Sequence, residues 1–203
     1  MWSENALMRK PPETISEALG RRGAPMGANA AAAGANPYWS EEYSEYSDNC
    51  QRCVVAYEQR RRGYDVIAQP TYKGDKWPTG GPNARWRGAF RHAKTDIVGK
   101  KTVDGTMQSI RSKMLEYGNG ARAVIGVVGP GHGHVFIVEN KNGSLWFMEP
   151  QRNTYGDSNR YTIQDMQNML RKVDTSKTNL TRVDNLQTSY RVKEFVEQRK
   201  RRK

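Results

Sequence analysis

Three short apolar runs follow one another in the second half of the chain and predict an antiparallel sheet. Residues 121–128 form a nearly continuous apolar run, which is typical of a buried strand. Residues 134–139 and 144–149 are two further apolar runs, and residues 140–143, which contain an Asn-Gly pair, link them. Because Asn-Gly between two apolar runs is a strong hairpin signal, we expect these two strands to pair.

Apolar residues three or four positions apart predict helices over residues 106–117 and 163–173. Residues 64–70 and 180–183 are shorter apolar segments that we interpret as further strands, and residues 71–105, rich in Gly, Pro, Trp and Lys, are expected to be mostly loop. The order helix, strand, helix, meander, helix, strand indicates an α+β domain with an antiparallel sheet.

An earlier helix is predicted to begin after Asn49 and to end near Gly63, and it carries both cysteines of the chain. Asn49 is a favourable N-cap whose side chain can accept from a free N–H of the first turn. The apolar positions of this helix fall three or four apart, so we expect one face to pack inward. Cys50 and Cys53 lie near the positive end of the helix dipole, which favours a thiolate over a thiol.

Composition and charge narrow the class of protein. The chain has 203 residues, 36% of them hydrophobic, and a formal net charge of +12. Its most apolar run, residues 123–128, is too short to cross a bilayer, and the first residues lack the pattern of a signal peptide. We therefore expect no membrane association, and two cysteines favour a reducing compartment over a disulfide scaffold.

The two ends of the chain differ from its middle. Residues 1–40 contain Pro, Gly and Ala segments without a sustained apolar period, and we interpret them as an extended or flexible N-terminal arm. Residues 41–187 form the predicted domain, and residues 188–203 a basic tail, in which Arg191–Lys203 holds seven basic and two acidic side chains. Such a tail is typical of nucleic-acid binding and equally of a solvated, solubilising segment.

A cysteine nucleophile needs a base, and the chain has three histidines. His92 lies in a basic, loop-like stretch, whereas His132 and His134 open the first strand of the hairpin. Glu149 ends the returning strand, so the hairpin places it roughly opposite His134, where it can orient the imidazole. The alternatives are a strand-end histidine beside a rim carboxylate, or a zinc site formed by the two cysteines with His132 and His134.

The chain carries two separated motifs. The first comprises residues 49–58 (NCQRCVVAYE) with residues 60–66 and 68–70, and the second runs from residues 133–136 (GHVF) to residues 149–151 (EPQ). They resemble the motifs of the papain-fold toxin family, the glutamine-deamidase-type papain-like domains of polymorphic toxins and bacterial effectors, with relatives in phage and prophage genes. The resemblance covers about residues 41–187. It implies a papain-like α+β fold in which an N-terminal nucleophile helix packs on a small antiparallel sheet.

The resemblance also implies a catalytic triad of Cys50 as nucleophile, His134 as base and Glu149 as orienting acid, with no cofactor and no metal. One departure is Glu149, because the family usually has Asp before the Pro-Gln pair. Asn49, Cys53 and Gln151 are expected to support the site. The spacing leaves Cys53 open as the nucleophile, as a core residue, or as a redox partner of Cys50.

The implied activity is that of a cysteine-dependent amidase, most specifically a toxin- or effector-like protein glutamine deamidase acting on glutamine side chains. Transglutaminase and protease chemistry would use the same three residues. The alternative is a non-catalytic phage structural or virion-associated protein with a papain-like fold, whose basic tail, Arg191–Lys203, binds nucleic acid or capsid partners. Either interpretation predicts a phage-encoded protein located in the virion or the host cytoplasm.

Overall fold

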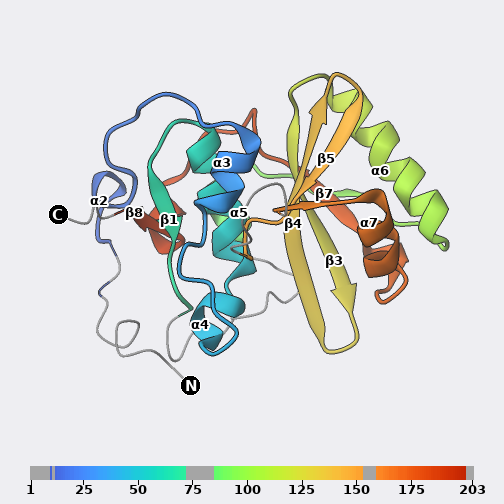
Figure 1. Ribbon diagram of the computed structural model, residues 1–203. Coiled ribbons are helices and arrows are strands. Elements are labelled where there is room, and N and C mark those ends of the chain that lie inside the picture. The colour runs from blue at the N-terminus through green and yellow to red at the C-terminus, as the bar shows by residue number, and fades with distance from the viewer. Residues whose placement is uncertain (1–9, 11, 72–84, 153–158, 200–203) are drawn as a thin grey trace.

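A six-stranded antiparallel sheet organises the computed structural model, which describes residues 10, 12–71, 85–152 and 159–199 (Figure 1). The strands in spatial order are β2 (Asp96–Ile97), β7 (Asn179–Arg182), β3 (Arg122–Gly129), β4 (His132–Lys141), β5 (Ser144–Met148) and β6 (Arg160–Tyr161). The predicted strands at residues 121–128, 134–139, 144–149 and 180–183 are therefore confirmed, with small differences at their ends.

The predicted hairpin joins β4 to β5 through a two-residue turn. Lys141 pairs with Ser144, so Asn142 and Gly143 alone form the turn, and both have positive φ angles, of 51° and 86°. Asn and Gly tolerate this left-handed conformation at both positions, which a tight hairpin with the normal strand twist requires. The turn fixes the register of the whole hairpin, including the end that carries the candidate site.

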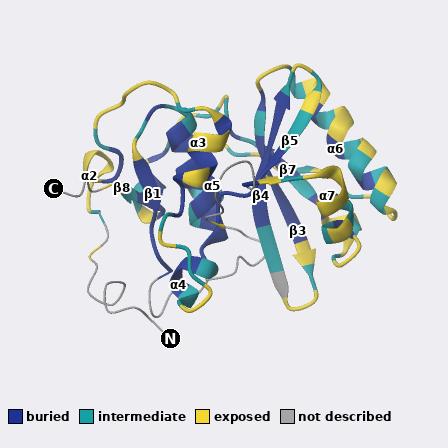
Figure 2. Ribbon diagram, viewed as in Figure 1, coloured by how far each residue is buried: buried dark blue, intermediate teal, exposed yellow. Residues whose placement is uncertain are grey.

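Side chains from the two faces of the sheet enter two different hydrophobic clusters. Ile137 on β4 faces the cluster built around α5 (Cys50–Arg61), whereas its neighbour Phe136 faces the cluster under α6 (Val103–Tyr117) and α7 (Ile163–Leu170). Figure 2 shows the central strands buried between the two groups of helices. Burial on both faces explains why these strands are nearly continuous apolar runs rather than alternating ones.

The cysteine-bearing helix α5 lies at the centre of the part of the molecule that covers one face of the sheet. Ten of its twelve residues are buried, because α5 packs between the sheet on one side and α3 (Ala28–Ala33) and β1 (Val66–Ala68) on the other. The expectation of a single inward face is wrong for this reason. The predicted end at Gly63 is confirmed: α5 ends at Arg61, and Gly63 takes a φ of 99°.

Two buried glutamates attach α5 to the sheet. Glu58 accepts from Arg122 of β3 at 2.7 Å, and Glu139 of β4 accepts from Arg61 at 2.7 Å and from the Tyr57 hydroxyl at 2.5 Å. Both glutamates are at most 2% exposed. Burying charges is costly unless they are paired, so these pairs must form when the helix docks on the sheet.

The described part of residues 1–40 is not an extended or flexible arm. It contains α2 (Ile15–Leu19) and α3, and Ala18, Ala28 and Ala31 belong to the buried cluster around α5. Alanine lets a helix approach its neighbour closely without a strong apolar signal in the sequence, which is why the segment resembled a linker. The boundaries 41–187 of the predicted domain stay a prediction.

The described part of the predicted basic tail folds back onto the protein. Residues Tyr190–Glu194 form the 3-10 helix η4, and β8 (Val196–Gln198) pairs with β1 in a small second sheet. Val192 and Val196 are fully buried, and these few apolar side chains among the charges decide the packing of the segment. Residues 200–203 lie outside the described residues.

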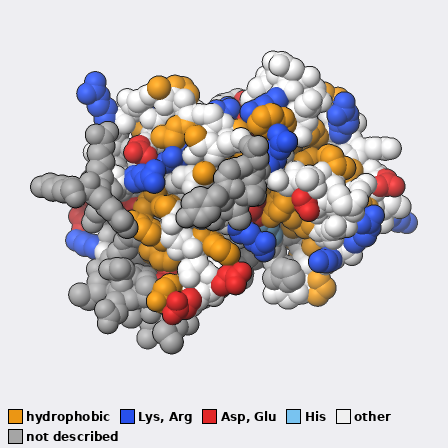
Figure 3. Space-filling model, in the orientation of Figure 1, with side chains coloured by type: hydrophobic (Ala, Val, Ile, Leu, Met, Phe, Trp, Pro, Cys, Tyr) orange, Lys and Arg blue, Asp and Glu red, His pale blue; other side chains and the backbone are white. Residues whose placement is uncertain are grey.

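Lys and Arg side chains lie scattered among apolar and acidic ones on the face drawn in Figure 3. At the end of the chain, Arg191 donates to the Glu194 carboxylate at 2.9 and 3.0 Å, so part of that basic charge is paired. A role of Arg191–Lys203 in binding nucleic acid stays a prediction.

The remaining elements complete the connections. The stretch 71–105 is mostly loop in its described part, with the short elements η1 (Arg85–Ala89) and β2, whereas residues 72–84 lie outside the described residues. Helix α6 begins at Val103, three residues before its predicted start, because Thr102 caps its first turn by accepting from Gly105 N. Among the described residues, no helix is long and apolar enough to cross a membrane.

Candidate active site

Cys50 is the first residue of α5, but Asn49 does not cap the helix as predicted. The Asn49 side chain accepts no hydrogen bond from a backbone N–H of the first turn. It instead pairs with the side chain of Asn36 at 3.2 Å and donates to the Gln69 carbonyl at 3.2 Å. Asn49 therefore anchors the start of the helix to surrounding loops and leaves the first-turn N–H groups uncapped by its side chain.

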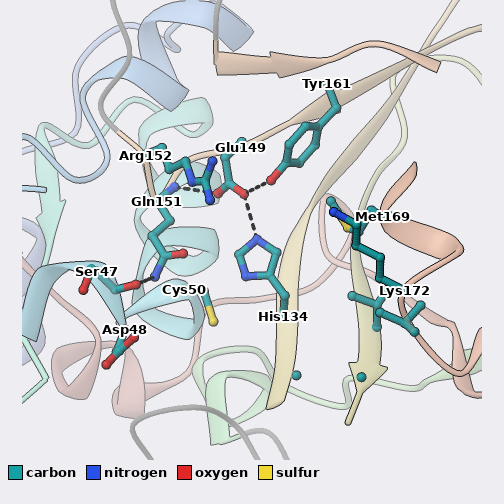
Figure 4. Close-up of a pocket in the computed structure, with 14 residues that line it drawn as sticks. Ser47, Asp48, Cys50, His134, Glu149, Gln151, Arg152, Tyr161, Met169 and Lys172 are labelled. Atoms are coloured by element: carbon teal, nitrogen blue, oxygen red, sulfur yellow. Dashed lines mark hydrogen bonds and ion pairs between the residues drawn. The ribbon is translucent and has the colours of Figure 1, made fainter. Parts of the chain in front are cut away.

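The Cys50 side chain lines a pocket of about 440 Å³ together with His134 and Glu149 (Figure 4). The pocket lies where the start of α5 and the end of α4 (Ser44–Ser47) meet the sheet and the C-terminal end of α7. Its lining residues are Ser47, Asp48, Cys50, Val127, Gly129, Gly133, His134, Glu149, Gln151, Arg152, Tyr161, Met169, Lys172 and Val173. Cys50 is 5% exposed, so a substrate reaches its sulfur only by entering this pocket.

His134 and Glu149 are joined by a hydrogen bond of 2.7 Å between Nε2 and Oε2. The hairpin predicted that the two residues lie roughly opposite each other, but they are diagonal neighbours. Met148 is the last residue of β5 and pairs with Ile137. Glu149 follows it and reaches diagonally to His134, which lies nearer the start of β4. A diagonal neighbour is within reach of a long side chain, and the extra methylene of Glu relative to Asp contributes to that reach.

The Glu149 carboxylate is held by three donors. Besides His134, the backbone N–H of Gln151 donates to Oε1 at 2.9 Å, and the Tyr161 hydroxyl donates to Oε2. Burial raises the pKa of Glu149, but His134, Tyr161 and the Gln151 N–H together lower it below its ordinary value. The carboxylate is therefore ionised at neutral pH.

His134 is shared between Glu149 and Cys50. Burial lowers the pKa of His134, but the Glu149 carboxylate and the hydrogen bond with Cys50 raise it by more, to about 10. Because Nε2 is bonded to Glu149, Nδ1 is the nitrogen left to contact the Cys50 sulfur.

Cys53 lies away from the pocket surface. Its side chain is fully buried, and its thiol donates to Asn49 Oδ1 at 3.1 Å. Burial, followed by the neighbouring Cys50 and Glu149, raises the pKa of Cys53 well above its ordinary value. These surroundings are those of an inert core cysteine rather than of an activated one.

Gln151 is part of the pocket, and it ties the loop after β5 to the end of α4 and to Asn36. Its side-chain Nε2 donates to the Ser47 carbonyl at 2.6 Å, and its own carbonyl accepts from Asn36 Nδ2 at 2.7 Å. Two residues of the site were not predicted from the sequence: Asn36, which donates to the Gln151 carbonyl, and Tyr161, which donates to Glu149. Neither carries a local signal, because their partners lie in other parts of the chain.

The other two histidines do not extend this cluster. His92 lies at an exposed turn with a φ of 58°, and the side chain of His132 lies outside the described residues. Within the described residues, no group of three or more His, Cys, Asp or Glu side chains is placed to hold a metal ion. The four-ligand zinc interpretation also requires Cys53, whose thiol is already bonded to Asn49.

A helix that begins with a cysteine and packs on an antiparallel sheet places this protein in the class of papain-like folds. The family model described as "Papain fold toxin 1, glutamine deamidase" matches residues 48–154, more than half of the chain, and the chain belongs to this family. The match spans the start of α5, both strands of the hairpin and the Glu149 loop.

Among solved structures, the chain is similar to a variant of the Salmonella effector SpvD. The two share 11% sequence identity with a TM-score of 0.49, and the superposition covers 85% of this chain and 84% of that one. No curated protein matches the sequence.

Proposed function

We propose that this protein is a cysteine-dependent protein glutamine deamidase in which Cys50 is the nucleophile, His134 the proton carrier and Glu149 the residue that orients His134. Membership of the glutamine deamidase family supports the reaction class. The observation that carries the assignment of residues is that Cys50 and His134 line one pocket and that His134 is hydrogen-bonded to Glu149 there.

The reaction begins when a substrate glutamine side chain enters the pocket. The Cys50 thiolate adds to the side-chain amide carbon, and the carbonyl oxygen becomes an oxyanion. The N–H groups at the start of α5 lie at the positive end of the helix dipole, so they stabilise this charge. The His134 imidazolium then donates its proton to the amide nitrogen, the carbon–nitrogen bond breaks, and ammonia leaves.

A thioester between Cys50 and the substrate remains after ammonia has left. His134 is now neutral and takes a proton from an incoming water, which attacks the thioester carbon. Breaking the carbon–sulfur bond releases a glutamate side chain and restores the Cys50 thiolate and the His134 imidazolium. Glu149 stays ionised throughout and holds the imidazole ring with Nδ1 toward the sulfur.

Mass spectrometry of candidate target proteins tests this proposal. Wild-type protein should convert specific glutamines to glutamates with release of ammonia, and Cys50→Ala should lower the rate by about 10³-fold or more. Cys53→Ala is the matched control, because it also removes one sulfur from α5 and should retain activity. Amine incorporation would indicate a transglutaminase, and chain cleavage a protease.

The non-catalytic alternative has its own signature. If Cys50 were inert, its alkylation near neutral pH would be slow and would not depend on His134. Absence of any glutamine conversion together with slow alkylation would contradict the deamidase proposal and favour the non-catalytic alternative.

A further inference from the structure

Tyr161 and His134 donate to the same carboxylate oxygen, Oε2 of Glu149 (Figure 4). Tyr161 ends the short edge strand β6, where it pairs with Phe147 of β5. The strand pairing therefore brings the hydroxyl to the carboxylate from β6, whereas His134 reaches the same carboxylate from β4.

An aromatic row fixes the position of the Tyr161 ring. The ring of Phe136 stacks on that of His134 with centroids 5.8 Å apart, and it meets the ring of Tyr161 edge-on at 5.4 Å. Both Tyr161 and His134 are thus held by the same buried side chain. Because burial, followed by the Glu149 charge, raises the pKa of Tyr161, the hydroxyl stays a neutral donor at physiological pH.

We propose that Tyr161 is a positioning residue that controls, through Glu149, how readily His134 releases its proton. A hydrogen bond to Oε2 withdraws part of the charge that otherwise stabilises the His134 imidazolium. With Tyr161 in place, the imidazolium is held strongly enough to support the Cys50 thiolate and weakly enough to protonate ammonia. The catalytic part of this inference rests on the proposed function, whereas the effect on His134 does not.

The other charged groups near His134 and Glu149 stay in place when Tyr161 is changed to Phe. Asp48, Arg152 and Lys172 line the same pocket, and Asp165 at the start of α7 acts on Tyr161 from a distance. On α5, Cys53 is fully buried, is bonded to Asn49 and stays a protonated thiol. All of these remain when the Tyr161 hydroxyl alone is removed, so a change in His134 then reports the lost hydrogen bond.

The test is the pH at which His134 loses its proton, followed by NMR of its ring and by the pH profile of Cys50 alkylation with iodoacetamide. Tyr161→Phe should move this step to higher pH by on the order of 1 unit, because the carboxylate then pulls harder on the imidazolium. Tyr117→Phe is the control, since Tyr117 also donates to a carboxylate, that of Asp96, far from the pocket. An unchanged profile in a folded Tyr161→Phe protein would overturn the inference.

A second variant predicts the opposite sign. Site-specific 3-fluorotyrosine at position 161 keeps the ring and strengthens the donor, so the His134 step should move to lower pH. A purely structural role predicts no shift in either variant. In a Glu149→Gln background, Tyr161→Phe should add no further shift, and an undiminished shift there would show that Tyr161 acts by another route.

Substrate turnover separates this inference from the deamidase proposal. With a glutamine substrate, Tyr161→Phe should lower kcat more than it changes KM, because the hydroxyl is bonded to Glu149 rather than left free in the pocket. If no glutamine is converted and the His134 shift is nevertheless observed, the proposed function fails and the role of Tyr161 stands. If glutamine is converted but the His134 shift is not observed, the role of Tyr161 fails and the proposed function stands.

Discussion

The side-chain amides of Asn36 and Asn49 hydrogen-bond to each other in both directions, each contact measuring 3.2 Å. Asn36 also donates to the carbonyls of Tyr46, at 2.8 Å, and Gln151, at 2.7 Å. One buried side chain thus connects the start of α5 with the loop that carries Glu149. The distance between Cys50 and His134 depends on this connection, since the two residues lie on different halves of the fold.

Replacing Asn36 with Ala should therefore weaken both stability and reactivity. It removes the Asn36 donor from the Gln151 and Tyr46 carbonyls and one of the partners of the buried Asn49 amide, and each buried group left unsatisfied costs about 1–3 kcal/mol. Urea unfolding should show the loss, and Cys50 alkylation near neutral pH should slow as the two halves separate. Asn168→Ala, an exposed change on α7, is the control and should alter neither. Normal stability in Asn36→Ala would contradict the assigned connection.

The two cysteines should differ sharply in reactivity. In native protein, iodoacetamide should modify Cys50 alone, because Cys53 is fully buried with a raised pKa. Cys53 should react only after unfolding. Peptide mapping of alkylated native and unfolded protein gives the measurement, and Cys53→Ala should leave the native labelling rate unchanged. Preferential labelling of Cys53 in the native state would instead make it the nucleophile.

Local sequence signals predicted the parts of the site that depend on short-range structure. The Asn-Gly turn sets the hairpin register, so the meeting of His134 and Glu149 could be predicted, although their diagonal geometry could not. Cys50 was found because it opens a helix and belongs to a recognisable motif. Each of these signals acts over a few residues.

The parts that the sequence did not reveal depend on contacts between distant segments. Asn36 meets Gln151 across 115 positions of the chain, and neither residue has a pattern that announces the contact. The alanines of α3 and the few apolar residues of β8 gave too weak a periodic signal to oppose the Gly, Pro and basic residues around them. Tertiary packing, rather than propensity, decides the structure of such segments.

The stabilising effect of His134 should depend on pH. Its pKa rises from 6.5 to about 10 in the folded protein, so its contribution to stability is fully present below about pH 6.5 and is lost as the pH rises through about 10. The difference in unfolding free energy between wild type and His134→Gln should therefore shrink over that range. Urea unfolding of both proteins at several pH values measures it, and subtracting the variant removes the effect of other titrating groups. A constant difference would show that His134 is neutral in the folded state.

The last prediction concerns Glu58, which accepts from Arg122 of β3 and, at 2.7 Å, from Arg62 of its own helix. Its carboxylate is fully buried, and Arg122 is only 15% exposed. Glu58→Gln should destabilise the protein by about 3–5 kcal/mol, because it leaves two largely buried guanidinium groups without their counter-charge. Glu116→Gln is the control: its pair with Lys113 is exposed, and its loss should cost at most about 1 kcal/mol. Since the Glu58 pair joins α5 to the sheet, the variant should also slow Cys50 alkylation, whereas a stable and fully reactive Glu58→Gln protein would show that apolar packing alone holds the two halves together.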